Sequence, residues 1–324
     1  MIKTRITDML GIDHPVVCGG MMWVGRAELA SAVSNAGGLG MLTALTQATP
    51  EDLRDEIERC KTMTDRPFGV NLTILHSIVP RPYEEYRQAI IEGGVKAVET
   101  VCAKPQEHFD AFKAHGVTII HKCTSARHAL TAERLGADII SIDGFECAGH
   151  PGEDDVPGLV LIPATVDKVK IPVIASGGIG DGRGLVAALA LGAEGVNMGT
   201  RFCATVEAPI HDNIKQLLVS NSERDTHLLY RQFRNTGRVV KNKVSDTVAG
   251  ILKNPDAKFE EIADLVKGTL NREGLESGDI DVGLIWGGQV QGLIHDVPTC
   301  EALLRRIMDE ATAIVDSRLR TMAT

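Results

Sequence analysis

No stretch of the sequence reaches the roughly eighteen uninterrupted apolar residues that a membrane-spanning helix needs. The first residues also lack the apolar run of a secretory signal. The seven cysteines are odd in number, widely spread and form no CxxC pair. The sequence therefore encodes neither a disulfide framework nor a zinc site. We expect a cytoplasmic protein that has no membrane span and no bound metal.

The chain also lacks an excess of positive charge. It has 34 Lys and Arg against 43 Asp and Glu, a net charge of −9, and no cluster of basic residues. This balance argues against nucleic acid as a main partner, although it leaves room for a local anion site. A chain of 324 residues with 44% hydrophobic residues can bury one large core, or one barrel with an appendage. The expected partners are small molecules.

The most informative stretch covers residues 173–184 and continues at residues 195–201. Each part is a short apolar run that ends in glycine and other small residues, and the first then enters a helical run over residues 185–191. Glycine has no Cβ, so backbone amides can converge on an anion there, and a helix amino terminus adds a favourable dipole. In (β/α)8 barrels the loops after strands seven and eight commonly bind phosphate. The stretch therefore predicts a phosphate site.

Six further strands are predicted upstream. They lie at residues 14–21, 39–45, 67–73, 97–101, 117–122 and 138–143. Helices lie between them, one of them with Thr49 as N-cap and Pro50 as first residue, and a longer loop follows the third strand at residues 74–82. Strands that alternate with helices pair in parallel through right-handed crossovers, and eight in about 190 residues favour a closed barrel. A Rossmann fold is the alternative, but no GxGxxG follows the first strand.

The pattern changes after residue 201. Residues from about 208 to 274 read as helices without β-branched runs between them, and a final amphipathic helix is expected from residue 299 to about 320 as the last outer helix of the barrel. We predict an α/β chain in three parts. They are a (β/α)8 TIM barrel that holds the cofactor (residues 1–207), a mostly helical extension (208–284) and a return to the barrel (285–324).

Polar residues at the carboxyl ends of the predicted strands are candidates for function, because barrel chemistry lies on that rim. A buried Lys122 needs an anionic partner, which is either a ligand or Asp143. His150 is either a proton donor or acceptor near neutral pH or a surface histidine. The acidic residues 153–155 read as a solvated loop more than as a metal site.

Seven motifs occur in order along nearly the whole chain. They lie at residues 19–21, 37–40, 71, 121–123, 144–152, 176–178 and 198–202. Together they resemble the nitronate monooxygenase family, formerly called 2-nitropropane dioxygenases, which are FMN-dependent TIM barrels. Within that family, residues 144–158, 181–184 and 289–292 look most similar to the bacterial NADH:quinone reductases.

The resemblance implies a non-covalently bound FMN and a role for each matching residue. The phosphate would be held by Ser176, Gly177, Gly178, Gly199 and Thr200. The ribityl chain and the isoalloxazine ring would be surrounded by Gly20, Met21, Met22, Asn71, Thr73, Lys122 and Ala148. His150 would be the catalytic residue beside the substrate.

The activity implied first is that of an NAD(P)H:quinone reductase, with NADH or NADPH as co-substrate. The alternatives are a nitronate monooxygenase that oxidises alkyl nitronates with O2, with His150 as base or hydrogen-bond donor, and an enoyl-thioester reductase. A non-enzymatic FMN-binding protein is the alternative from another class. The physiological acceptor, the choice of nicotinamide nucleotide and the oligomeric state stay open.

Overall fold

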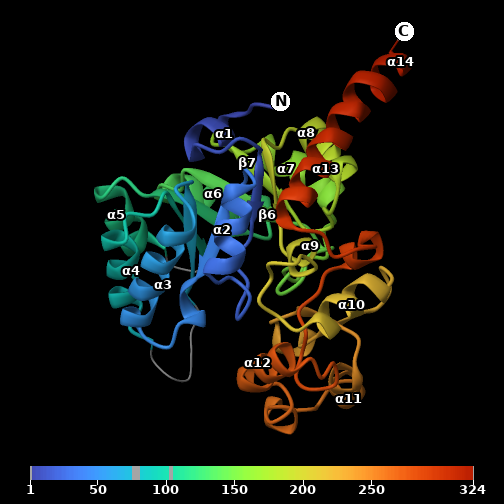
Figure 1. Cartoon of the computed structure of the whole chain (residues 1–324). Helices are drawn as coiled ribbons and strands as arrows, with labels where there is room; N and C mark the ends of the chain where they lie inside the picture. The colour runs from blue at the N-terminus through green and yellow to red at the C-terminus, as the bar shows by residue number, and fades with distance from the viewer. Residues whose placement is uncertain (1, 75–80, 102–104, 324) are drawn as a thin grey trace.

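The computed structural model describes residues 2–74, 81–101 and 105–323 (Figure 1). Most of the predicted loop at residues 74–82 lies outside the described residues. The predicted (β/α)8 barrel is confirmed: eight parallel strands are ordered β1-β8-β7-β6-β5-β4-β3-β2. The strands are β1 (Val16–Cys18), β2 (Gly40–Thr43), β3 (Phe68–Thr73), β4 (Ala97–Val101), β5 (Thr118–Cys123), β6 (Ile139–Asp143), β7 (Val173–Ser176) and β8 (Gly195–Met198).

The barrel closes between β1 and β2. The Leu39 amide donates to the Val16 carbonyl and the Leu39 carbonyl accepts from the Cys18 amide, both at 2.9 Å. β1 is shorter than the predicted strand at residues 14–21, because the Gly20 amide donates to the side chain of Glu99 instead of to a neighbouring strand. The residues after Cys18 are thus freed for the carboxyl end of the barrel.

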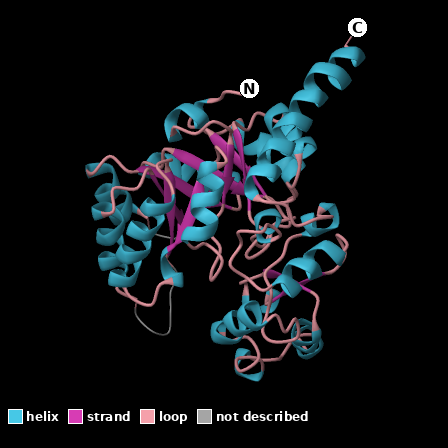
Figure 2. Ribbon diagram, in the orientation of Figure 1, coloured by secondary structure: helices cyan, strands magenta, loops and turns pink. Residues whose placement is uncertain are grey.

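Outer helices surround the barrel and pack against its strands (Figures 1 and 2). They are α2 (Ala27–Asn35), α3 (Pro50–Met63), α4 (Tyr83–Glu92), α5 (Gln106–Ala114), α6 (Ala126–Leu135), α7 (Gly158–Val166), α8 (Gly182–Ala190) and α13 (Cys300–Ala313). α3 begins as predicted: the Thr49 hydroxyl accepts from the Asp52 amide at 3.1 Å, and Pro50 is the first helical residue. Its Leu53 and Ile57 side chains are fully buried, which fixes its inner face.

The two ends of the barrel differ. At the amino end, the short helix α1 (Arg5–Leu10) buries Ile6 and Leu10 in one cluster with inward residues of the strands, such as Met41 and Ile120. At the other end, residues between α9 (Thr200–Cys203) and α13 form the extension (Figure 1). The plug at the amino end leaves the carboxyl end as the place for a ligand.

The predicted final helix is confirmed. α13 packs between α8 and α2 and completes the outer ring. The helix continues through a π-helical segment (Ile314–Leu319) into α14 (Arg320–Met322), and this last part leaves the body of the molecule (Figure 1). Among the described residues, no helix has both the length and the apolarity needed to cross a bilayer.

The extension is only partly as predicted. It contains α10 (Asp212–Ser220), α11 (Lys243–Ile251) and α12 (Gly268–Ser277), but also an antiparallel pair, β9 (Thr226–Leu229) and β10 (Gly237–Val240). The prediction of helices without strands was wrong there. Both strands are four residues long, which is too short for a clear alternating pattern in the sequence. They are stabilised by the packing of buried Leu229 and Val239. The boundaries at residues 207 and 284 remain predictions.

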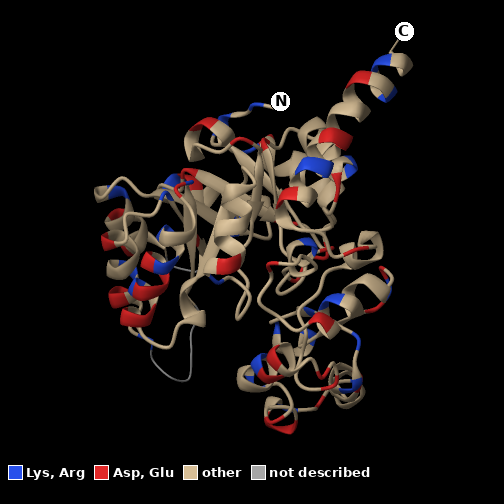
Figure 3. Cartoon of the chain, in the orientation of Figure 1, with Lys and Arg blue, Asp and Glu red and all other residues tan. Residues whose placement is uncertain are grey.

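Charged residues lie mainly on the outer helices and the extension (Figure 3). The eight barrel strands carry three Asp, Glu, Lys or Arg residues, namely Glu99, Lys122 and Asp143. These lie on the neighbouring strands β4, β5 and β6. Because an isolated buried charge is costly, each of the three requires a partner.

One buried histidine predicts a pH dependence of stability. His121, on β5, is 6% exposed; its Nδ1 lies 2.8 Å from the Thr100 hydroxyl and its ring packs edge-on to Phe109. Burial, with a smaller contribution from His128, lowers its pKa from 6.5 to about 4. The unfolded chain takes up a proton at His121 near the ordinary pKa of 6.5, whereas the folded chain takes it up only near pH 4. The contribution of neutral His121 to the free energy of unfolding is therefore complete above pH 6.5 and is lost as the pH falls toward 4.

We expect the free energy of unfolding to fall by about 2 kcal/mol more in the wild type than in His121→Asn between about pH 7.5 and about pH 5. Urea unfolding at the two pH values measures this difference. Equal losses in the two proteins would show that other groups govern the acid sensitivity.

Candidate functional site

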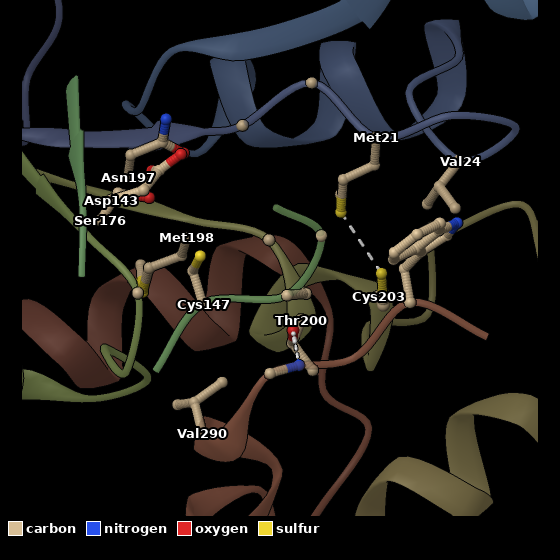
Figure 4. Close-up of a pocket in the computed structure, with 18 of the residues that line it drawn as sticks. Met21, Val24, Asp143, Cys147, Ser176, Asn197, Met198, Thr200, Cys203 and Val290 are labelled. Carbon is tan, nitrogen blue, oxygen red and sulfur yellow. Dashed lines mark hydrogen bonds between the residues drawn. The ribbon is translucent and has the colours of Figure 1, made fainter. Parts of the chain in front are cut away.

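A cavity of about 270 Å³ lies at the carboxyl end of the barrel (Figure 4). Predicted site residues that line it are Gly20, Met21, Met22, Lys122, Ala148, Ser176, Gly177, Gly178, Gly199 and Thr200. They come from the loops after β1, β6, β7 and β8, from the ends of β5 and β7, and from the first residue of the short helix after β8. The structure thus brings most of the predicted set together around one space.

Three predicted residues do not line this cavity. The Asn71 amide turns toward Glu99 and donates to it at 2.8 Å, and the Thr73 hydroxyl donates to the Asn71 oxygen at 3.1 Å. His150 lies exposed beside the cavity, with its ring centroid 5.6 Å from that of Trp286, which does line it. Desolvation lowers the pKa of His150 from its ordinary value, and Glu153 opposes this shift.

The turns after β7 and β8 carry unused hydrogen-bond donors. Gly177 and Gly178 have φ of 89° and 74°, the left-handed region that glycine adopts without strain. In the described part of the chain, the backbone amides of Gly177, Gly178, Gly199 and Thr200 donate to no protein acceptor. Free amides at two adjoining turns suit an anion such as a phosphate.

Lys122 has the anionic partners that the sequence left open. Its ammonium lies 3.6 Å from Asp143 and 4.0 Å from Glu99. Burial pushes its pKa down, but the two carboxylates outweigh burial and hold the pKa above its ordinary value. Burial raises the pKa of Asp143 against the effect of Lys122. One oxygen of Asp143, Oδ1, is buried without a hydrogen-bond partner among the described residues, so this end of the cavity has capacity for a donor from a ligand.

The extension covers the cavity, which sequence reasoning missed. Its side chains form an apolar roof of Ile210, Ile214, Leu218, Leu275, Ile285, Trp286 and Val290. The same segment supports the loops: the Gly288 amide donates to the Thr200 hydroxyl at 3.0 Å and the Gln289 amide to the Glu146 carbonyl at 3.0 Å. The Gly287-Gly288 pair after two apolar residues was the signal that could have placed this segment at the site.

The loop after β6 is fastened to the hairpin of the extension. Buried Arg238 donates to the carbonyls of Cys147 and Phe145, at 3.1 and 2.8 Å. Glu153 accepts from the Thr236 amide at 2.8 Å, and Asp155 accepts twice from Arg231. Residues 153–155 are exposed, as expected of a solvated loop, and two of their carboxylates also bind the hairpin. These contacts fix the wall that contains Ala148.

Comparison with known proteins assigns the family. A sequence model described as nitronate monooxygenase matches residues 3–310. The chain belongs to the nitronate monooxygenase family. This match confirms the family that the seven motifs indicated. It does not distinguish the quinone reductase subgroup from the rest of the family.

Relatives in this family carry different activities in their names. The chain is 33% identical, over 98% of each sequence, to a dehydrogenase of a hydroxy-methyl-oxo-octahydroindene-carboxyl-CoA from Rhodococcus jostii. It is 28% identical to a probable nitronate monooxygenase from Staphylococcus saprophyticus, over 97% of this chain and 99% of that one. The structure of FabK from Thermotoga maritima is similar with a TM-score of 0.91 and 36% identity, over 99% and 100% of the chains. The protein is an oxidoreductase of this family.

Proposed function

We propose that the chain is an FMN-dependent NAD(P)H:quinone reductase of the cytoplasm. The donors of the cavity fit FMN: the free amides of Gly177, Gly178, Gly199 and Thr200 suit one terminal phosphate. An FAD adenylate would need a second groove with its own pyrophosphate loop, which the sequence does not offer. Five of the described cysteines, Cys18, Cys60, Cys147, Cys203 and Cys300, are free thiols, which suits a reducing compartment.

When bound, FMN would accept a hydride from NADH or NADPH and pass two electrons to the acceptor. The chain's own residues provide position and charge. Lys122 is a fixed cation beside the space that the cofactor would occupy, and the backbone amides after β7 and β8 are fixed partial positive charges. Trp286 and the rest of the apolar roof exclude water from the side facing the extension.

The roof is the observation that carries the choice of a quinone. Flat apolar acceptors match its apolar side chains, and it presents no acid or base. Among the described lining residues outside the roof, Lys122 and Asp143 form an ion pair that leaves Asp143 Oδ1 open to a donor, and Glu146 accepts from the Gly158 amide. Burial raises the pKa of the Cys203 thiol to about 12. In quinone reduction, NAD(P)H, a proton from solvent and a quinone give NAD(P)⁺ and a hydroquinone. This reaction needs no catalytic base, so it suits a cavity with an apolar roof.

Nitronate oxidation is less well supported. It requires a polar group over the reacting atoms, and the residue expected to provide it, His150, does not line the cavity. The second candidate is an oxidoreductase of a CoA thioester, which the 33% identity to the CoA-ester dehydrogenase favours. That chemistry exchanges a proton with carbon and needs a placed acid or base.

The acceptor is tested by reoxidation. Holoprotein reduced anaerobically with one equivalent of NADH is mixed in a stopped-flow instrument with a benzoquinone or with crotonyl-CoA. We expect the quinone to restore the oxidised flavin spectrum and crotonyl-CoA to leave it reduced. Reoxidation by crotonyl-CoA alone would replace the proposal with the thioester candidate.

A substitution at His150 should affect the two half-reactions differently. Since the imidazole packs against Trp286 and does not line the cavity, His150→Asn should keep the rate of flavin reduction by NADH within about tenfold, a change under about 1.4 kcal/mol. Any larger effect should fall on the quinone half-reaction, which takes up protons. Stopped-flow measurement of both half-reactions checks this. A large loss confined to NADH oxidation would mean that His150 organises the nicotinamide.

A further inference from the structure

Glu99 occupies an unusual position in the barrel. It lies in the middle of β4, is 0% exposed and does not line the cavity. Barrel interiors are normally filled by bulky apolar side chains. A carboxylate at this place would lower stability unless its oxygens were fully used.

Both carboxylate oxygens are in use. Oε1 accepts from the Gly20 amide at 3.0 Å and from the Asn71 side chain at 2.8 Å, and Oε2 accepts from the Asn197 side chain at 2.9 Å. The Lys122 ammonium lies 4.0 Å from Oε2. These partners belong to β3, β5, β8 and the loop after β1, so one side chain joins four walls of the barrel.

The partners of Glu99 face the ligand. Gly20, Lys122 and Asn197 line the cavity directly, and Asn197 lies on the same side of it as Asp143 and Ser176 (Figure 4). A Cβ on Gly20 would lie 2.3 Å from the Asn71 side chain, so Asn71 is packed tightly against the loop that Glu99 holds. Glu99 therefore stands one layer behind the cavity wall.

We propose that Glu99 is the positioning residue of the cofactor site, which aligns Gly20, Asn71 and Asn197 and sets how much of the Lys122 charge reaches the ligand. This rests on the proposed binding of FMN. The groups that face Lys122 are Glu99 from β4 and Asp143 from β6. With both carboxylates ionised the three groups carry one net negative charge, and removal of the Glu99 charge leaves them neutral.

Loss of the Glu99 charge changes the reduction potential of the bound cofactor. Reduced FMN carries more negative charge than oxidised FMN, so a less compensated Lys122 stabilises the reduced form. Glu99→Gln should therefore make the reduction potential of bound FMN more positive. In this variant the side-chain NH2 of glutamine faces the Asn197 donor, at the place where the carboxylate oxygen of Glu99 accepted. Because the residues that Glu99 aligns lose their positions, FMN should bind about tenfold or more weakly.

The matched control is Glu56→Gln. Glu56, on α3, is also buried and accepts from the Ala27 amide at 2.8 Å, but its partners lie outside the cavity. Apoprotein of each variant is titrated with FMN by flavin fluorescence, the potential is measured by equilibration with a reference dye, and Tm is recorded. We expect both variants to lose Tm, and only Glu99→Gln to change Kd and potential.

A Glu99→Gln protein with the wild-type Kd and potential would overturn the positioning role, whatever its Tm. If that variant does not fold, Asn197→Ser removes one donor and keeps the carboxylate; a weaker Kd supports the proposal and an unchanged Kd contradicts it. Wild-type and Glu56→Gln proteins that bind no FMN would instead overturn the proposed function, and this role with it.

Discussion

Lys122→Met is expected to lower the free energy of unfolding by about 3–5 kcal/mol and to remove most of the bound FMN. The ammonium is the only basic group among the three charged residues of the barrel strands, and its side chain is 19% exposed. Without it, Glu99 and Asp143 remain as uncompensated buried carboxylates. Urea unfolding gives the stability, and the ratio of flavin to protein after purification gives the occupancy.

Lys215→Met is the control for the loss of a buried lysine. Lys215, on α10, is 4% exposed and donates to the Val206 carbonyl at 3.1 Å, and it does not line the cavity. It should lose stability and keep FMN. Full flavin occupancy in Lys122→Met would contradict the placement of the cofactor beside Lys122.

Gly178→Val is expected to weaken FMN binding by about a hundredfold, or about 2.7 kcal/mol. A β-branched residue at a φ of 74° is strained, and its Cβ would lie 3.1 Å from the Cβ of Glu146. The turn must shift, and the amides of Gly177 and Gly178 move away from a shared anion. Titration of the apoprotein with FMN measures the change.

Gly94→Val is the matched control for backbone strain. Gly94 has a φ of 61°, and a Cβ there would meet no atom within 4 Å. It should reduce stability and leave the affinity for FMN unchanged. A Gly178→Val protein that is soluble and fully yellow would show that the turn after β7 does not hold the phosphate.

The barrel could be predicted because its signals are local and repeated. Apolar strand runs alternate with amphipathic helices, and Thr49 with Pro50 marks a helix start in the sequence itself. The hairpin β9–β10 could not be predicted, because its strands are short and are stabilised by packing with distant residues such as Leu284. A contact of that kind leaves no period in the sequence.

The site was predictable where it consists of loops. Glycine pairs and polar residues at strand ends identified the turns after β7 and β8 and Lys122, because few other roles require those residues there. Glu99 and Asn197 lie within strands, and Ile214 and Leu218 lie on a helix, where each looks like an ordinary core position. His150 was placed beside the substrate from its motif, whereas in the structure its ring packs against Trp286 and does not line the cavity.

Anaerobic titration of the purified holoprotein with NADH, NADPH and propyl-2-nitronate, each alone, tests the central claim most directly. We predict that at least one nicotinamide nucleotide bleaches the flavin absorbance at about one equivalent. We predict that the nitronate leaves it oxidised. Bleaching by the nitronate, with both nucleotides inert, would contradict the reductase and identify a nitronate oxidiser.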